Sequence, residues 1–144
     1  MKVGIVKTSL KENESRVPIY PEHLPRFAPA LRSQMLLETG YGSRFGYPDE
    51  YFQQQGATVC PRNQVIEGCE LLVLPKPMPE DLQQMSPGQI LFGWVHCVQQ
   101  RAMAQAAIDR KLTLIAWEAM HHWNSVGEKQ LHVFYKNNEI AGYA

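Results

Sequence analysis

Three nitrogen-bearing side chains follow apolar, strand-like segments of the chain. Arg16 lies in the loop after KVGIV, Lys76 follows ELLVLP, and His96 follows ILFGWV. In open α/β sheets ligands bind beyond the carboxyl ends of the strands, so residues that follow separate strands can meet at one site. Two cations and one titratable imidazole suit a small organic anion such as a keto or amino acid, with the imidazole as general acid or base.

Each of these residues also has an ordinary structural interpretation. The prolines on both sides of Lys76 hold its ammonium in a defined direction, but prolines also end strands beside solvated lysines. His96 leaves a strand among apolar neighbours that can shift its pKa, although a lone histidine there is more often structural. Arg16 can clamp a carboxylate with two hydrogen bonds, or pair with Glu12 or Glu14 at the surface. Position alone does not decide between these roles.

Two other motifs fit their chemistry less well. His121 and His122 lie close in sequence to Glu118 and His132. Adjacent histidines cannot both face one ion in regular structure, and no second ligand pair has metal-site spacing, so we expect no metal. The glycines of GYGSRFG follow a strand, but their spacing differs from GxGxxG and no helix opens at the third glycine. We interpret them as turn formers and expect no cofactor-binding residues in this chain.

Alternating strands and helices are predicted to position these residues. Apolar, β-rich segments predict strands at 1–7, 34–38, 57–60, 70–74, 89–95 and 112–117. Helical spacing predicts helices at 21–32, 48–55, 62–67, 79–85 and 99–110, the first shortened or broken by prolines. Beyond 120 the sequence is polar, then weakly alternating, and ends as a helix begins. This order predicts a three-layer α/β fold: a mostly parallel sheet with right-handed crossovers and helices on both faces.

The composition limits the class of protein. The 144 residues fit one domain, and equal numbers of basic and acidic residues, 14 each, without a basic block indicate no nucleic-acid partner. The three cysteines, Cys60, Cys69 and Cys97, lack CxxC spacing, which favours reduced thiols and a cytoplasmic protein. No apolar run approaches the roughly 20 residues of a membrane helix, and no signal peptide precedes the first strand, so we expect no membrane partner.

Six segments taken together resemble a known family. They are MKVGIVK, NESRVP, LLETGYGSRFGYPDEYFQQQGATV, LLVLPKPMPEDL, GQILFGWVHC and LTLIAWEAM, and in this order they are similar to the N-terminal domain of the alanine dehydrogenase and pyridine nucleotide transhydrogenase family. The resemblance implies a single Rossmann-like or flavodoxin-like substrate domain over 1–144. It implies that Arg16 and Lys76 bind the carboxylate and carbonyl of an oxo acid. Lys76 and His96 would be catalytic, with His96 exchanging a proton at the reacting atom.

The resemblance extends to a branch of the family. GWVHC and FYKNNEIAGYA are more similar to the secondary-amine branch, which includes carboxyethylornithine synthase and lysine-forming saccharopine dehydrogenase, enzymes that join an oxo acid to a side-chain amine. LPKPM and Trp117 differ from the alanine dehydrogenase pattern, which puts alanine as substrate in doubt. The implied activity is that of an NAD(P)-dependent oxidoreductase acting on CH–NH or CH–NH2 donors. The alternatives are the N-terminal domain of alanine dehydrogenase or transhydrogenase, and a non-catalytic small-molecule binding module.

Enzymes of the resembled family continue beyond the segment that corresponds to EIAGYA. They carry a second, nucleotide-binding domain and a returning C-terminal helix. We therefore expect a truncated chain that holds half of the active-site cleft, is inactive alone, and depends on the absent domain for most of its contact with NAD or NADP. A homo-oligomer is compatible with the resemblance. The sequence does not fix the amine, the oxo acid, the choice of nucleotide or the oligomeric state.

Overall fold

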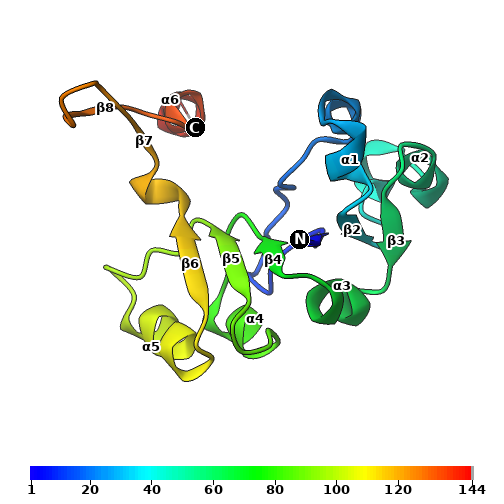
Figure 1. Ribbon diagram of the computed structural model, residues 1–144, viewed down its shortest axis with the longest axis horizontal. Coiled ribbons are helices and arrows are strands. Elements are labelled where there is room, and N and C mark those ends of the chain that lie inside the picture. Colours follow the sequence, from blue (N-terminus) through cyan, green and yellow to red (C-terminus); the bar gives the residue numbers. More distant parts are fainter. Residues whose placement is uncertain (144) are drawn as a thin grey trace.

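The structure, a computed structural model, describes residues 1–143. Six parallel strands form its central sheet (Figure 1). They are β1 (Val3–Ile5), β2 (Met35–Glu38), β3 (Thr58–Cys60), β4 (Leu71–Val73), β5 (Ile90–Gly93) and β6 (Thr113–Ala116). Their spatial order, β3-β2-β1-β4-β5-β6, is that of a Rossmann sheet rather than a flavodoxin sheet. The order reverses between β1 and β4, the place where such sheets bind ligands beyond their carboxyl ends.

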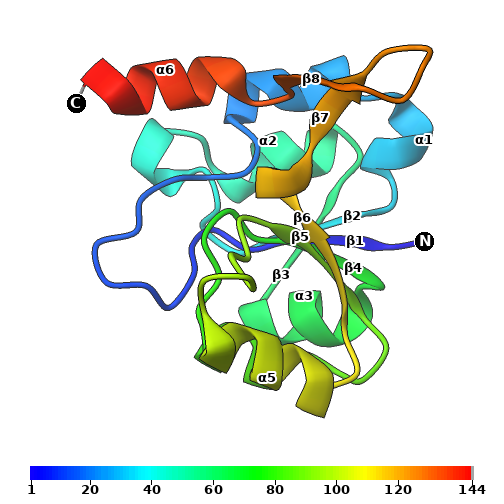
Figure 2. The ribbon, with the colours of Figure 1, turned by 90° about the vertical axis from the view of Figure 1, so that its left-hand side faces the viewer.

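Helices cover both faces of the sheet (Figures 1 and 2). One face carries α3 (Arg62–Gly68), α4 (Pro79–Gln83) and α5 (Arg101–Asp109), and the other carries η1 (Pro21–Arg26), α1 (Pro29–Arg32) and α2 (Asp49–Gln54). Two further 3-10 turns are η2 (Ser43–Phe45) and η3 (Trp117–Ala119). The predicted helix at 21–32 is broken into η1 and α1, because proline removes a backbone donor and clashes with the preceding turn. The predicted α/β fold is confirmed, and each strand of the parallel sheet lies within its predicted, longer range.

The core has two apolar halves because successive side chains of a strand point to opposite faces. Val3 and Ile5 of β1 and Leu37 of β2 pack with Leu24 and Phe52 on the α1–α2 face. On the other face a second cluster joins the sheet to α3, α4 and α5, and its members include Leu36, Leu72, Leu91, Val65, Leu82 and Met103. Each fully buried side chain of this kind contributes about 1.5–3 kcal/mol. The carboxyl ends of the strands are thereby held from both sides.

The segment after η3 forms a hairpin and a helix that the polar sequence did not fully predict. β7 (His121–Trp123) pairs antiparallel with β8 (Lys129–His132), and α6 (Tyr135–Tyr143) follows. The turn is closed by Asn124, whose Oδ1 accepts from the N–H groups of Val126 (3.1 Å) and Glu128 (2.8 Å). An asparagine turn of this kind can be recognised in the sequence. The expectation of a merely polar stretch beyond residue 120 did not use this signal. The helix expected at the end of the sequence is confirmed.

The hairpin and α6 lie over the same face that α1 and α2 cover elsewhere (Figures 1 and 2), and Phe134 packs against Trp117 with 5.1 Å between ring centroids. An apolar hollow of about 320 Å³ lies on this face, lined by residues that include Val3, Val73, Phe92, Trp117 and Phe134. β6 is an edge strand of the sheet. Cys60, Cys69 and Cys97 are free thiols. Within 1–143, every helix is too short or too polar to cross a membrane.

Candidate functional site

Backbone hydrogen bonds hold the chain together where β4 and β5 end. The Leu74 N–H donates to the Phe92 carbonyl (3.1 Å), and the Trp94 N–H donates to the Pro75 carbonyl (3.0 Å). A Cβ atom on Gly93 would lie 2.0 Å from the Leu74 carbonyl oxygen, so this close approach requires glycine. The segments that carry Lys76 and His96 therefore leave the sheet side by side.

Lys76 is half-buried and lies three residues after the end of β4. Burial lowers its pKa below the usual value of 10.5, and the nearby charge of Arg16 acts in the same direction. The carboxylates of Glu118 and Glu14 oppose this shift. The ammonium of Lys76 thus lies within electrostatic range of a second cation, and an anion bound to both would relieve their repulsion.

His96 follows β5 in a left-handed backbone conformation, with φ of 48°. Its N–H donates to Glu118 Oε1 (2.5 Å), and its ring stacks on Trp94 with 6.3 Å between ring centroids. Left-handed residues other than glycine are uncommon, and they persist where the surroundings hold them in place. Here the Glu118 carboxylate holds the backbone of the turn, and the imidazole lies against the Trp94 ring.

Glu118 lies in η3, directly after β6. Its second oxygen, Oε2, is buried and has no hydrogen-bond partner within the described part of the chain, and the same holds for the neighbouring Trp117 Nε1. An orphaned buried acceptor and donor are costly unless a ligand or another segment satisfies them. This acid was considered in the sequence only as a metal ligand. Its place after a parallel strand, like that of Lys76 and His96, is the signal that could have identified it.

Arg16 is fixed by its neighbour Glu14. The guanidinium donates to both carboxylate oxygens, Nε to Oε1 at 2.8 Å and Nη2 to Oε2, and the Arg16 N–H also reaches Oε1 (2.9 Å). These bonds lower the pKa of Glu14 to about 2. The ion pair of Arg16 with Glu14, one of the two structural alternatives for this arginine, is therefore present. The Glu14 side chain is 3% exposed and the Arg16 side chain 52%, so the acid is buried while the guanidinium stays accessible.

Arg16 borders a hollow of about 230 Å³, hereafter the Arg16 hollow, with Pro75, Trp94, Trp117 and Phe134 among its other walls. The residue before Lys76 and the ring that stacks on His96 therefore both face it. The structure thus brings the segments of all three predicted residues to one edge, linked through Glu118 and Trp94. A small organic anion with a reactive carbonyl fits the charge of this arrangement.

The described residues contain no group of three or more His, Cys, Asp or Glu side chains that could hold a metal ion. The rings of His121 and His132 pack edge to face with centroids 4.8 Å apart.

The residues after β1 do not fit a dinucleotide, because the pyrophosphate needs glycines at the turn that follows this strand. Lys7, Thr8 and Ser9 stand there instead. The GYGSRFG glycines serve turns and packing: Gly40 has φ of 75°, and a Cβ on Gly42 would lie 2.7 Å from the Phe52 ring.

Comparison with known proteins gives consistent matches. The family profile described as alanine dehydrogenase/PNT, N-terminal domain, matches residues 4–141. N(5)-(carboxyethyl)ornithine synthase of Clostridium botulinum is 28% identical over 156 residues, covering 100% of this chain and 47% of that protein. Alanine dehydrogenase of Methanococcus maripaludis is 28% identical over 144 residues, covering 99% of this chain and 37% of that protein.

A solved structure of an L-alanine dehydrogenase superposes on this fold with a TM-score of 0.70 at 25% identity, covering 85% of this chain and 34% of the other. The chain therefore spans less than half the length of each of these relatives.

Proposed function

The chain belongs to the family of alanine dehydrogenase/PNT N-terminal domains, and from this premise we propose that residues 1–144 form the substrate-binding domain of a dehydrogenase that joins an oxo acid to an amine. The observation that carries the proposal is the hydrogen bond from the His96 N–H to Glu118, which joins the segments after β5 and β6, together with the electrostatic effect of Arg16 and Glu118 on the pKa of Lys76, which follows β4. This edge adjoins the point where the strand order reverses.

In the proposed reaction Arg16 and Lys76 bind the oxo acid. The guanidinium, held by Glu14, takes the carboxylate, and the Lys76 ammonium polarises the carbonyl oxygen. The positive charges of Arg16 and Lys76 repel each other. An anion bound to both is therefore stabilised by relief of this repulsion as well as by direct hydrogen bonds. His96 exchanges a proton with the oxygen or nitrogen at the reacting carbon.

The dinucleotide is proposed to bind outside these residues. Enzymes of this family use NAD(P), which supplies the hydride that reduces the imine. The turn after β1 does not suit a pyrophosphate, so we assign NAD or NADP to a part of the protein other than residues 1–144.

The amine is proposed to be the side-chain amine of an amino acid. The similarity of GWVHC and FYKNNEIAGYA to the secondary-amine branch supports this choice, and a carboxyethylornithine synthase is among the relatives that match the whole of this chain, with 47% of that protein covered. An alanine dehydrogenase, which uses ammonia, is the second candidate, because relatives with that name match at the same identity.

The test is to express the full-length protein and follow oxidation of NADH or NADPH with pyruvate and one amine at a time: ornithine, lysine or ammonium. We expect pyruvate-dependent turnover with ornithine or lysine. Turnover with ammonium alone would identify an alanine dehydrogenase. Binding of pyruvate without turnover in any mixture would contradict the proposed catalysis and favour a binding module.

A further inference from the structure

A second hollow lies on the other side of the segment that carries Arg16. Its volume is about 310 Å³, within the size range of small-molecule sites, and we name it the Arg44 hollow. It opens at the carboxyl ends of β1 and β2, and its walls include Lys7, Thr8, Glu14, Gly40, Ser43 and Arg44. Val17 borders both this hollow and the Arg16 hollow. The chain segment from Glu14 to Val17 therefore separates two neighbouring spaces.

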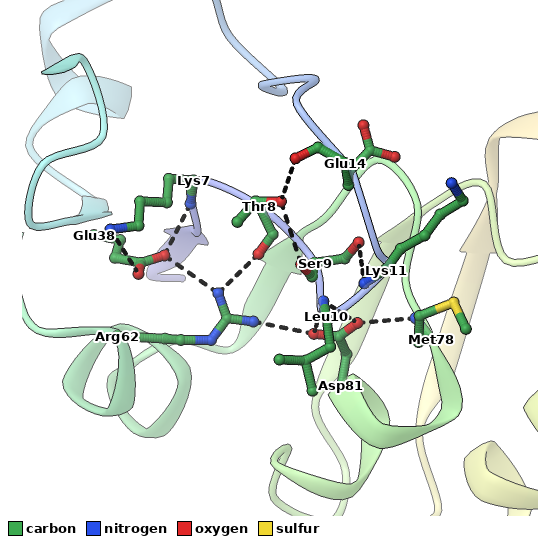
Figure 3. A network of polar contacts seen from close by, with 10 residues as sticks. All are labelled: Lys7, Thr8, Ser9, Leu10, Lys11, Glu14, Glu38, Arg62, Met78 and Asp81. Carbon is green, nitrogen blue, oxygen red and sulfur yellow. Dashed lines mark hydrogen bonds and ion pairs between the residues drawn. The ribbon is translucent and has the colours of Figure 1, made fainter. Parts of the chain in front are cut away.

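Two wall residues of the Arg44 hollow, Lys7 and Thr8, are tied through their backbone to a buried polar network (Figure 3). Arg62 lies between two acids: Nη1 donates to Glu38 Oε2 (3.3 Å) and to the Thr8 carbonyl (2.8 Å), and Nη2 donates to Asp81 Oδ1 (3.0 Å). Glu38 and Asp81 are only 7% and 2% exposed. The Lys7 N–H also donates to Glu38 Oε2 (2.9 Å). The chain after β1 is thus held in one position before any ligand binds.

The Arg44 hollow presents cationic donors that the protein does not fully use. The Lys7 Nζ lies 3.8 Å from Glu38 Oε1, but this carboxylate already accepts from Arg62, and the Lys7 side chain is 47% exposed. Arg44 donates through Nη1 to the Ser15 carbonyl (3.2 Å), and among residues 1–143 no carboxylate forms an ion pair with it.

Glu14 does not cancel this positive charge, because its carboxylate is bound to Arg16. A guanidinium and an ammonium with spare donors at one hollow suit a carboxylate group.

We propose that the Arg44 hollow binds the α-carboxylate of the amino acid substrate, whose side-chain amine then reaches the reacting carbon beside Lys76 and His96. The inference rests on the proposed function. A carboxylate in this hollow cannot belong to the small oxo acid bound by Arg16 and Lys76, because the segment from Glu14 to Val17 stands between them. Because this segment lies between the two hollows, a molecule that reaches both must carry its reacting amine several bonds away from its carboxylate. An amino acid with a terminal side-chain amine meets this requirement, whereas ammonia and α-amines do not.

The test compares two amines in the full-length protein: ornithine, and 1,4-diaminobutane, which lacks the carboxylate. Arg44→Met is expected to raise the KM for ornithine by about tenfold or more, since it removes a hydrogen bond to a charged group. It should leave the KM for pyruvate within about twofold and abolish the preference for ornithine over 1,4-diaminobutane. Arg101→Met, which changes an exposed arginine at the start of α5 on the opposite face, is the matched control. Lys7→Met is the second variant should Arg44→Met fail to fold.

Each outcome separates this inference from the proposed function. If Arg44→Met and Lys7→Met both leave turnover with ornithine unchanged, the Arg44 hollow is not a subsite, but the proposed reaction stands. Turnover with ammonium but not ornithine would overturn the subsite and identify the alanine dehydrogenase alternative. If no amine is turned over, the proposed function fails, and calorimetry decides the subsite: ornithine binding that Arg44→Met weakens supports it, and absent binding overturns it.

Discussion

Two regions at the same edge of the sheet differ in how completely their carboxylates are hydrogen-bonded. In the first, the pinned region, Arg62 and the N–H groups after β1 satisfy the carboxylates of Glu38 and Asp81, although Arg62 Nε itself has no partner among the described residues. In the second, the rim formed by Lys76, His96 and Glu118, a buried carboxylate oxygen has no partner among the described residues and the pKa of the lysine is lowered. Fully bonded carboxylates indicate structural support, whereas the orphaned oxygen of Glu118 indicates where a ligand is expected.

The largest effect should come from breaking the pinned region. Asp81→Ala removes a buried carboxylate that accepts from Arg62 and from the N–H groups of Leu10 and Met78, leaving these donors, among them the partly buried guanidinium, without their partner. We expect a loss of about 3 kcal/mol in the free energy of unfolding, measured by urea denaturation. Glu80→Ala, which changes the exposed acid beside it, should have little effect. Equal stability of the two variants would mean that the network does not hold this region.

The rim should respond in activity rather than stability. In the full-length enzyme, His96→Ala is expected to lower kcat by a factor on the order of 10² or more, because the proton-transfer group is lost. The free energy of unfolding should change little, since the Glu118 bond is made by the backbone of His96 and not by its ring. Gln99→Ala, at a neighbouring exposed residue, is the control. An unchanged kcat would remove His96 from the proposed mechanism.

The lowered pKa of Lys76 predicts how oxo-acid binding depends on pH. The charged ammonium binds the anion, so affinity for pyruvate should be highest while Lys76 is protonated and should fall as the pH rises through a pKa that lies below 10.5. Lys76→Met should weaken binding and remove this dependence, whereas Lys129→Met, on β8, should retain it. Pyruvate affinity measured across alkaline pH tests this, and the same pH dependence in Lys76→Met would contradict it.

The smallest effect should be on acid stability. Because the Arg16 bonds lower the pKa of Glu14 from 4.5 to about 2, the folded state favours its charged form. This contribution is present above pH 4.5 and is lost as the pH falls toward 2. Glu14→Gln should therefore show a smaller loss of stability across that range than the parent, in urea denaturation at each pH. Glu12→Gln, an exposed neighbour, should behave like the parent, and an acid profile unchanged by Glu14→Gln would refute the assignment.

The sequence was informative where a local pattern determines the structure. Apolar runs located each strand of the parallel sheet, and the residue that follows a run marked Lys76 and His96. The strand order was not accessible, because similar alternating patterns serve both Rossmann and flavodoxin sheets. The hydrogen bond from the His96 N–H to Glu118 joins residues that follow two different strands, and no local sequence pattern predicts it. The same is true of Gly93, whose necessity depends on the Leu74 carbonyl opposite it.

The position of β6 at the margin of the sheet has a consequence for handling the protein. Among residues 1–143 no strand pairs with its outer row of N–H and C=O groups, and Ile115, 39% exposed, adds an apolar side chain there. Unprotected margins of this kind recruit extended peptides from other molecules and promote aggregation. β6 counters this by being short, from Thr113 to Ala116, which allows few intermolecular bonds. Precipitation should therefore set in at high protein concentration, and a lysine in place of Ile115 should delay it.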